Sequence, residues 1–135
     1  MFLRLVTAAA VLTSAAVHLY LWFDVFSGEP VVGPAFLANA AAGLVIAVLL
    51  VRRRNWLPGF LALGFGGTTM GAFVVAATVG LFGVHEHWTG WPVWTAAVSE
   101  VVAIVGGALL LSRTAPTLSR RQLQHPFAAR RAHLH

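Results

Sequence analysis

Three polar side chains with the potential for chemistry stand inside long apolar stretches of this 135-residue sequence. They are His18, Asn39 and Glu100. An imidazole and a carboxyl buried together can share one proton, as an ion pair or as a neutral hydrogen-bonded pair, and such a pair titrates jointly. Intramembrane relays use groups of this kind to move protons or cations. The structural alternative is that the three residues only fix helix register through buried hydrogen bonds.

Composition identifies the environment of these residues as a membrane. Apolar residues make up 59% of the chain and charged residues 10%, and the mean hydropathy is +0.80. A soluble domain carries about 25% charged residues. The sequence has no Cys, which excludes disulfides, thiolate chemistry and Cys-ligated metal centres. We therefore predict an integral membrane protein.

Four segments are long and apolar enough to cross a bilayer, which requires about 20 residues in a helix. They cover residues 3–26, 31–51, 57–84 and 91–111. Because backbone groups in lipid must bond internally, each segment is predicted to be helical. The first is expected to be retained, since its apolar part exceeds the roughly 7–15 residues of a signal peptide. The expected fold is all-α: a four-helix transmembrane bundle over residues 1–112, followed by a basic, unstructured cytoplasmic tail at 113–135.

The arginines predict the orientation of this bundle. All nine basic residues are Arg, and a four-span threading places them on one side: Arg4, Arg52, Arg53, Arg54, Arg113, Arg120, Arg121, Arg130 and Arg131. Positive charge in short loops stays cytoplasmic, so both termini are expected inside a plasma (cell inner) membrane. The net charge of +5 then reflects topology, and nucleic acid is not an expected partner. The loop and tail arginines are expected to face anionic lipid headgroups.

The spans place the three polar residues in one layer. At 1.5 Å per residue, His18, Asn39 and Glu100 each lie about 12–14 Å from the outer end of their helix. The candidate satellites of this layer are Ser14, Thr78 and Ser99. Small residues allow close approach of membrane helices. The predicted helix-packing positions are Gly64, Gly67, Gly71 and Gly107.

A second candidate site is the outer loop that contains His85 and His87. Together with Asp24 they offer imidazole and carboxylate ligands, which suit Zn²⁺ or Cu²⁺, and a zinc site needs three or four ligands. The alternative is a polar cap at the membrane interface. No other cofactor is expected, and haem is disfavoured because His18 lies about 12 Å deeper than the loop histidines. The sequence lacks the nucleophile-elbow, zinc-protease and phosphate-loop signatures, so no enzymatic activity is predicted.

Three segments carry a resemblance to a known group of proteins. They are residues 18–24 (HLYLWFD), Val32-Gly33-Pro34 with Asn39, and residues 78–83 (TVGLFG). With these segments the chain resembles small four-span integral membrane proteins of actinobacteria. The resemblance implies a four-span fold and no particular activity. The use of Arg without any Lys is typical of a GC-rich genome.

Three functions fit these observations. The first is an accessory or assembly partner in a larger membrane complex, or a small homo-oligomer, because little of the chain lies outside the bilayer. The second is a proton- or cation-coupled small carrier that uses His18, Asn39 and Glu100. The third is a membrane protein that binds metal on its outer face through His85 and His87.

Overall fold

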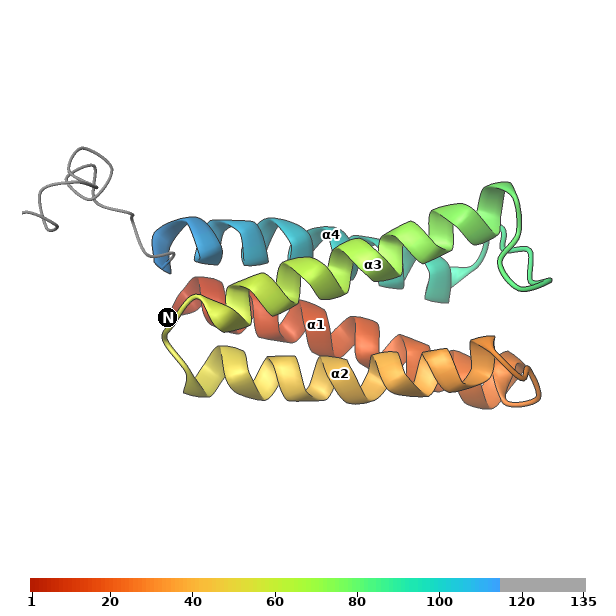
Figure 1. The fold of residues 1–135 in the computed structure, drawn as a ribbon, viewed down its shortest axis with the longest axis horizontal. Coiled ribbons are helices and arrows are strands. Elements are labelled where there is room, and N and C mark those ends of the chain that lie inside the picture. Colours follow the sequence, from red (N-terminus) through yellow and green to blue (C-terminus); the bar gives the residue numbers. More distant parts are fainter. Residues whose placement is uncertain (115–135) are drawn as a thin grey trace, which may run out of the picture.

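The computed structural model describes residues 1–114 and shows an all-helical bundle (Figure 1). Helix α1 spans Phe2–Leu21 and continues into a π-helical turn, Trp22–Phe26; α2 spans Val32–Arg52, α3 Leu57–Thr78 and α4 Trp91–Thr114. Each of the four helices is long and apolar enough to cross a membrane. The predicted all-α, four-helix fold is therefore confirmed. The tail at residues 115–135, with Arg120, Arg121, Arg130 and Arg131, lies outside the described residues.

The helices alternate in direction, so the two ends of the bundle differ in charge (Figure 1). One end, here named the arginine end, holds the start of α1, the α2–α3 connection and the end of α4, with Arg4, Arg52–Arg54 and Arg113. The opposite end, here named the acidic end, holds the two remaining connections. It carries Asp24, Glu29 and Glu86.

Arg4 has a structural task at the arginine end. Its side chain is buried, and its guanidinium donates hydrogen bonds to the carbonyl oxygens of Leu50, Arg53 and Asn55. These carbonyls belong to the last turn of α2 and the residues after it. A cation at a helix C-terminus is favourable because of the helix dipole. Arg4 therefore joins the start of α1 to the end of α2.

Small residues set the closest helix contacts. Helix α1 packs along α2 and α4, and α3 packs along α4, whereas α2 and α3 share few contacts. A Cβ built on Gly107 of α4 would lie 2.5 Å from the backbone nitrogen of Leu63 and 2.7 Å from the carbonyl oxygen of Gly59, both in α3. A Cβ on Gly66 would lie 2.8 Å from the carbonyl oxygen of Glu100. Helices α3 and α4 thus approach each other at backbone distance.

Helix α3 ends earlier than predicted. It stops at Thr78 and not at residue 84. The chain turns because Gly80, Phe82 and Gly83 have positive φ angles, and Leu81 pairs with Val84 across a tight turn. Phe82 and Gly83 lie between the paired residues, and two successive positive φ angles at these positions are typical of a type I′ hairpin turn. Apolar residues in this turn made it indistinguishable from helix by hydropathy alone.

The prediction that Gly64, Gly67 and Gly71 pack against other helices of this chain is wrong. A Cβ built on Gly64, Gly67 or Gly71 meets no other atom within 4 Å, so these positions lie on the outer face of α3. Helix α3 is apolar on all sides, so its hydrophobic pattern does not indicate which face packs against the other helices. Gly107 is the predicted position that does mediate a helix contact, with Gly59 of α3.

Replacing Gly107 with Ala should destabilise the bundle, because the added methyl must push the backbone of α3 away. Overpacking of this kind costs about 1–3 kcal/mol. Thermal unfolding in detergent should show a lower Tm for Gly107→Ala than for the wild type. Gly67→Ala is the matched control and should be neutral or slightly stabilising, since its methyl enters open space. Equal Tm values for the two variants would contradict this packing.

Candidate functional site

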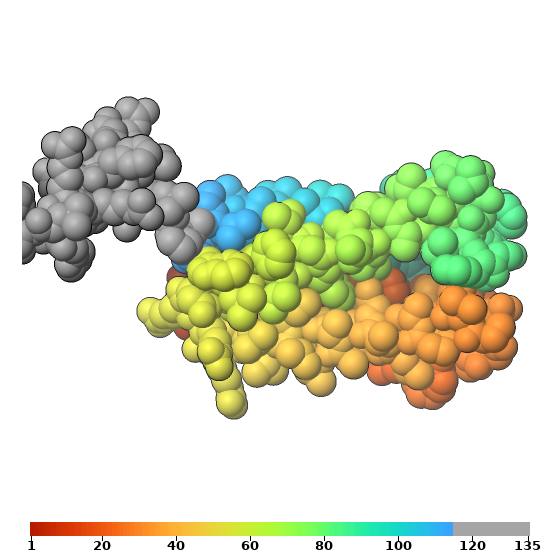
Figure 2. Space-filling view, in the orientation of Figure 1, coloured from red at the N-terminus to blue at the C-terminus, as the bar shows by residue number. Residues whose placement is uncertain are grey.

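A pocket of about 720 Å³ lies in the half of the bundle nearer the acidic end. All four helices and both connections at that end contribute to its lining. Figure 2 shows the surface hollowed between α2 and α3, the pair that shares few contacts. Its volume falls within the range of about 300–1,000 Å³ that is typical of small-molecule sites.

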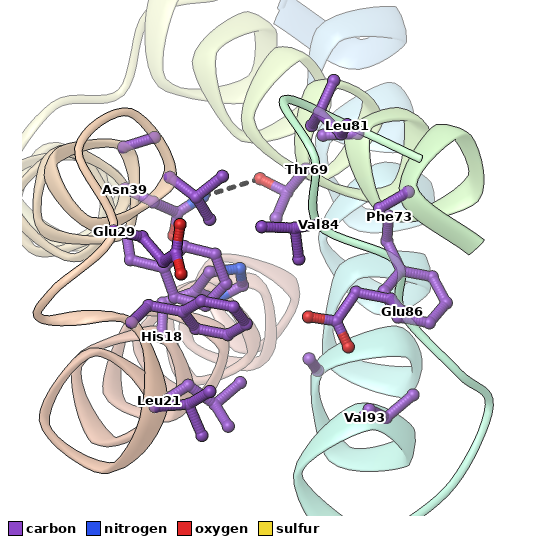
Figure 3. A pocket seen from close by; sticks show the side chains of 18 of the residues that line it. His18, Leu21, Glu29, Asn39, Thr69, Phe73, Leu81, Val84, Glu86 and Val93 are labelled. Atoms are coloured by element: carbon purple, nitrogen blue, oxygen red, sulfur yellow. Dashed lines mark hydrogen bonds between the residues drawn. The ribbon is translucent and has the colours of Figure 1, made fainter. Parts of the chain in front are cut away.

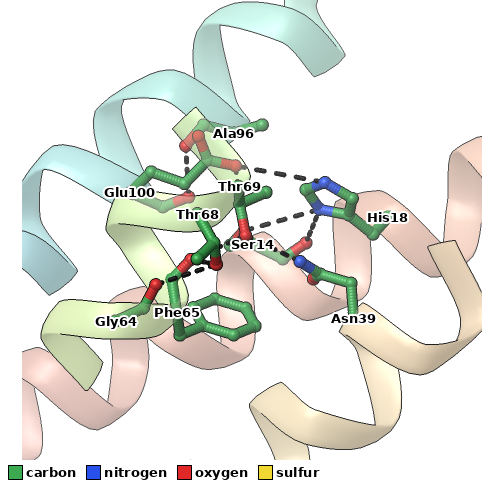
Figure 4. A network of polar contacts seen from close by, with 10 residues as sticks. Ser14, His18, Asn39, Gly64, Phe65, Thr68, Thr69, Ala96 and Glu100 are labelled. Atoms are coloured by element: carbon green, nitrogen blue, oxygen red, sulfur yellow. Dashed lines mark hydrogen bonds and ion pairs between the residues drawn. The ribbon is translucent and has the colours of Figure 1, made fainter. Parts of the chain in front are cut away.

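His18 of α1 and Glu100 of α4, here named the deep pair, both line the pocket, and Figure 4 shows their side chains facing each other. Their relative exposures are 8% and 2%, and His18 Nε2 lies 4.0 Å from Glu100 Oε1. Ser14 Oγ donates a hydrogen bond of 3.4 Å to Glu100 Oε1, and His18 Nδ1 donates one of 2.8 Å to the Ser14 carbonyl. A carbonyl only accepts, so Nδ1 carries a hydrogen and Nε2 is the nitrogen that faces Glu100.

One proton can be carried either by the His18 imidazole or by the Glu100 carboxyl. At 4.0 Å the two atoms are too far apart for a direct hydrogen bond. They form an ion pair when His18 is protonated and a neutral pair when the carboxyl holds the proton. The pair thus offers two neighbouring positions for one proton.

Asn39 of α2 and Thr69 of α3 join across the pocket (Figure 4). Asn39 Nδ2 donates a hydrogen bond of 2.8 Å to Thr69 Oγ1, and Thr69 donates its own hydrogen to the Phe65 carbonyl at 2.7 Å. Because Thr69 has no second hydrogen, it must accept from the amide, and this fixes the amide orientation. Asn39 Oδ1 is the single buried side-chain nitrogen or oxygen within residues 1–114 that has no hydrogen-bond partner.

The structure brings together most of the predicted polar layer. His18, Asn39 and Glu100 line one pocket, and Ser14 contacts both members of the deep pair. Thr78 and Ser99 do not line the pocket, and each donates its hydroxyl hydrogen to a carbonyl of its own helix, at Val74 and Ala96 respectively. The sequence prediction missed Thr69. The sequence contains no signal for it, because α3 is apolar on all sides and its buried face is not marked.

Two further carboxyl groups lie at the outer part of the pocket. Glu29 comes from the α1–α2 connection and Glu86 from the α3–α4 connection, and both side chains point into the pocket in Figure 3. The Glu86 amide donates a hydrogen bond of 3.2 Å to the Ala76 carbonyl, which ties this connection to α3. Partial burial raises the pKa of the Glu86 carboxyl above its ordinary value of 4.5, while the adjacent His87 acts in the opposite direction.

The candidate metal ligands are not gathered into one site. Among residues 1–114, no three His, Cys, Asp or Glu side chains are grouped closely enough to hold a metal ion. His85 lines the pocket and packs its ring against Gly80, where a Cβ would lie 2.6 Å from the ring. The structure therefore gives no support to a site formed by His85, His87 and Asp24.

Comparison with protein-family models, with curated proteins and with solved structures finds no match to this chain. The resemblance to small four-span actinobacterial membrane proteins therefore stays a prediction.

The pH dependence of stability should change when Glu86 becomes Gln. A carboxyl with a raised pKa favours the folded state while it is protonated, and that contribution is lost as the pH rises through the raised value. Gln stays neutral at every pH. The Tm of Glu86→Gln relative to the wild type should therefore be higher at about pH 7 than at about pH 4.

Thermal unfolding of both proteins in detergent at the two pH values measures this difference. Asp24→Asn is the matched control, because Asp24 is an exposed carboxyl at the same end and lies outside the pocket lining. A relative Tm of Glu86→Gln that stays constant or falls with pH would contradict the assigned environment of Glu86.

Proposed function

We propose that this protein is a small proton-coupled membrane carrier that binds its ligand in the pocket above His18 and Glu100. One observation carries the proposal: four apolar helices leave a cavity of about 720 Å³ open onto a buried carboxyl–imidazole pair. If the pair only fixed the helix register, it would need no cavity beside it and could be surrounded by packed side chains. Here the same pair faces space that a ligand can occupy.

The energetics support a functional role for this arrangement. Ionisable residues at membrane depth are costly, and they commonly mark ion pathways and proton relays. An unpartnered buried acceptor adds a further penalty of about 1–3 kcal/mol. Asn39 Oδ1 has this property at the same pocket. A ligand that bonds to Glu100 would offset the cost of burying its charge.

The proton coupling follows from competition at one carboxylate. A proton and a ligand that both bind Glu100 reduce each other's affinity by the same factor. His18 provides an alternative position for the proton, at 4.0 Å. Binding and release of the ligand are therefore linked to proton release and uptake at the pair.

The proposed orientation has both termini on the cytoplasmic side of the plasma (cell inner) membrane. The arginine distribution supports it, since positive charge in short loops stays inside. Arg52, Arg53 and Arg54 are exposed between α2 and α3, where they suit anionic headgroups. The pocket would then open toward the outer leaflet, at the acidic end.

A second candidate function is that of an accessory or assembly partner. The observation that favours it is the outer face of α3, where Gly64, Gly67 and Gly71 have open space around them. Small residues of this kind are enriched where membrane helices associate. A mild-detergent purification that repeatedly yields the chain as a lone monomer would argue against this role.

Dicyclohexylcarbodiimide tests the proposed carrier, because this apolar reagent modifies protonated carboxyl groups that it can reach. In reconstituted protein, peptide mass mapping should find an adduct on Glu100, and its yield should fall as the pH rises. The adduct should be absent from Glu100→Gln. Circular dichroism establishes whether that variant folds, and if it does not, site mapping in the wild type carries the test.

Asp24→Asn is the matched control and should keep the Glu100 adduct, since Asp24 does not line the pocket. A Glu100 carboxyl that stays unmodified at every pH in folded protein would overturn the proposal. Such a result would leave the pair with a structural role.

A further inference from the structure

The lining of the pocket has a one-sided charge. It contains Glu29, Glu86 and Glu100 together with two histidines, and within the described chain no Arg or Lys contributes to it. The arginines of residues 1–114 are all at the other end of the bundle. Carboxylates in a cleft with apolar walls focus a negative potential, which raises the local concentration of cations.

The carboxylates and the helix α3 hydroxyls of the pocket offer acceptors and no free hydrogen, whereas Thr89 and the two histidines are its donors. The hydroxyl hydrogens of Thr68 and Thr69 are both donated to helix carbonyls, at Gly64 and Phe65. Asn39 Oδ1 is a buried acceptor without a partner beside the pocket, and the amide nitrogen of the same side chain donates to Thr69. Glu100, once ionised, is an acceptor only. A ligand that binds at Glu100 must therefore supply hydrogens.

The walls of the pocket favour an apolar body on that ligand. Phe26, Phe36, Phe73 and Phe82 line it, and Phe36 packs against His18 with ring centroids 4.9 Å apart. Aromatic faces attract cations through their quadrupole. The hollow between α2 and α3 faces sideways from the bundle (Figure 2), which suits a molecule that partitions into the membrane interface.

From these observations we infer that the ligand is a protonated amine with an aromatic or other apolar body, which enters between α2 and α3. This inference rests on the proposed function and names its substrate class. The ammonium group would pass Glu29 and Glu86 and donate hydrogens to the Glu100 carboxylate. Its positive charge replaces that of the proton, so one proton leaves the His18–Glu100 pair as one ammonium binds.

Binding of naphthylmethylamine to the full chain in nanodiscs tests this assignment, with empty nanodiscs as the background. Calorimetry at about pH 7 should show saturable binding of the amine. The neutral isostere naphthylmethanol should bind about tenfold more weakly, because it lacks the charge-assisted hydrogen bonds. The trimethylammonium analogue keeps the charge and loses the N–H donors, so its affinity should lie between the other two.

Variants separate the pocket from non-specific partition. Glu86→Gln should weaken amine binding about threefold and leave the alcohol unchanged, because a rim charge acts weakly. Asp24→Asn should change neither affinity. In weakly buffered solution, amine binding to the wild type should release protons, and addition of the alcohol should release none.

Three results would overturn the inference. An alcohol that binds as tightly as the amine would exclude selection by charge, and a trimethylammonium analogue as tight as the amine would exclude the role of the N–H donors. Absence of saturable amine binding would reject the amine class altogether. In each case carbodiimide modification of Glu100, which does not depend on the ligand, decides separately whether the proposed proton-coupled site stands.

Discussion

The contact between His18 and Glu100 constrains the rest of the bundle. A carboxyl in a membrane interior needs partners from the protein, and α1 supplies two of them, Ser14 and His18, one turn apart. At the same residue α3 comes within backbone distance of α4, because Gly66 leaves space for the Glu100 carbonyl. Helices α1, α3 and α4 therefore converge on Glu100, and α2 is held mainly by α1.

Features that do not favour stability gather around the pocket. Asn39 Oδ1 is a buried acceptor without a partner, and the carboxyl of Glu86 is partly buried in the α3–α4 connection. Phe82 has a φ of 50° and is 71% exposed, although a bulky side chain disfavours that backbone conformation. Strained or unsatisfied groups are commonly retained at functional sites. Their concentration at one end of the bundle agrees with a site that is built for a ligand.

The sequence was sufficient to predict four helices and the shared layer of His18, Asn39 and Glu100, because both depend on local properties. Span length follows from hydropathy, and the depth of His18, Asn39 and Glu100 follows from the rise per residue. The buried face of α3 could not be predicted, since a helix that is apolar all round gives no amphipathic signal. Thr69 and the exposure of Gly64, Gly67 and Gly71 were missed for this reason. The pocket depends on how far α2 and α3 diverge, which no local pattern encodes.

The central claim is that the acid-lined pocket between α2 and α3, in the half of the bundle nearer the acidic end, is open to cations. The chain has no Cys, so a single introduced Cys is a specific reporter. Ala96→Cys lies in the pocket lining, and Val98→Cys lies on the exposed face of the same helix. We expect a cationic methanethiosulfonate to modify Ala96→Cys at least about tenfold faster than its anionic counterpart does. Neither reagent should modify Val98→Cys appreciably. Equal rates for the two reagents, or an unreactive Ala96→Cys in folded protein, would contradict the account.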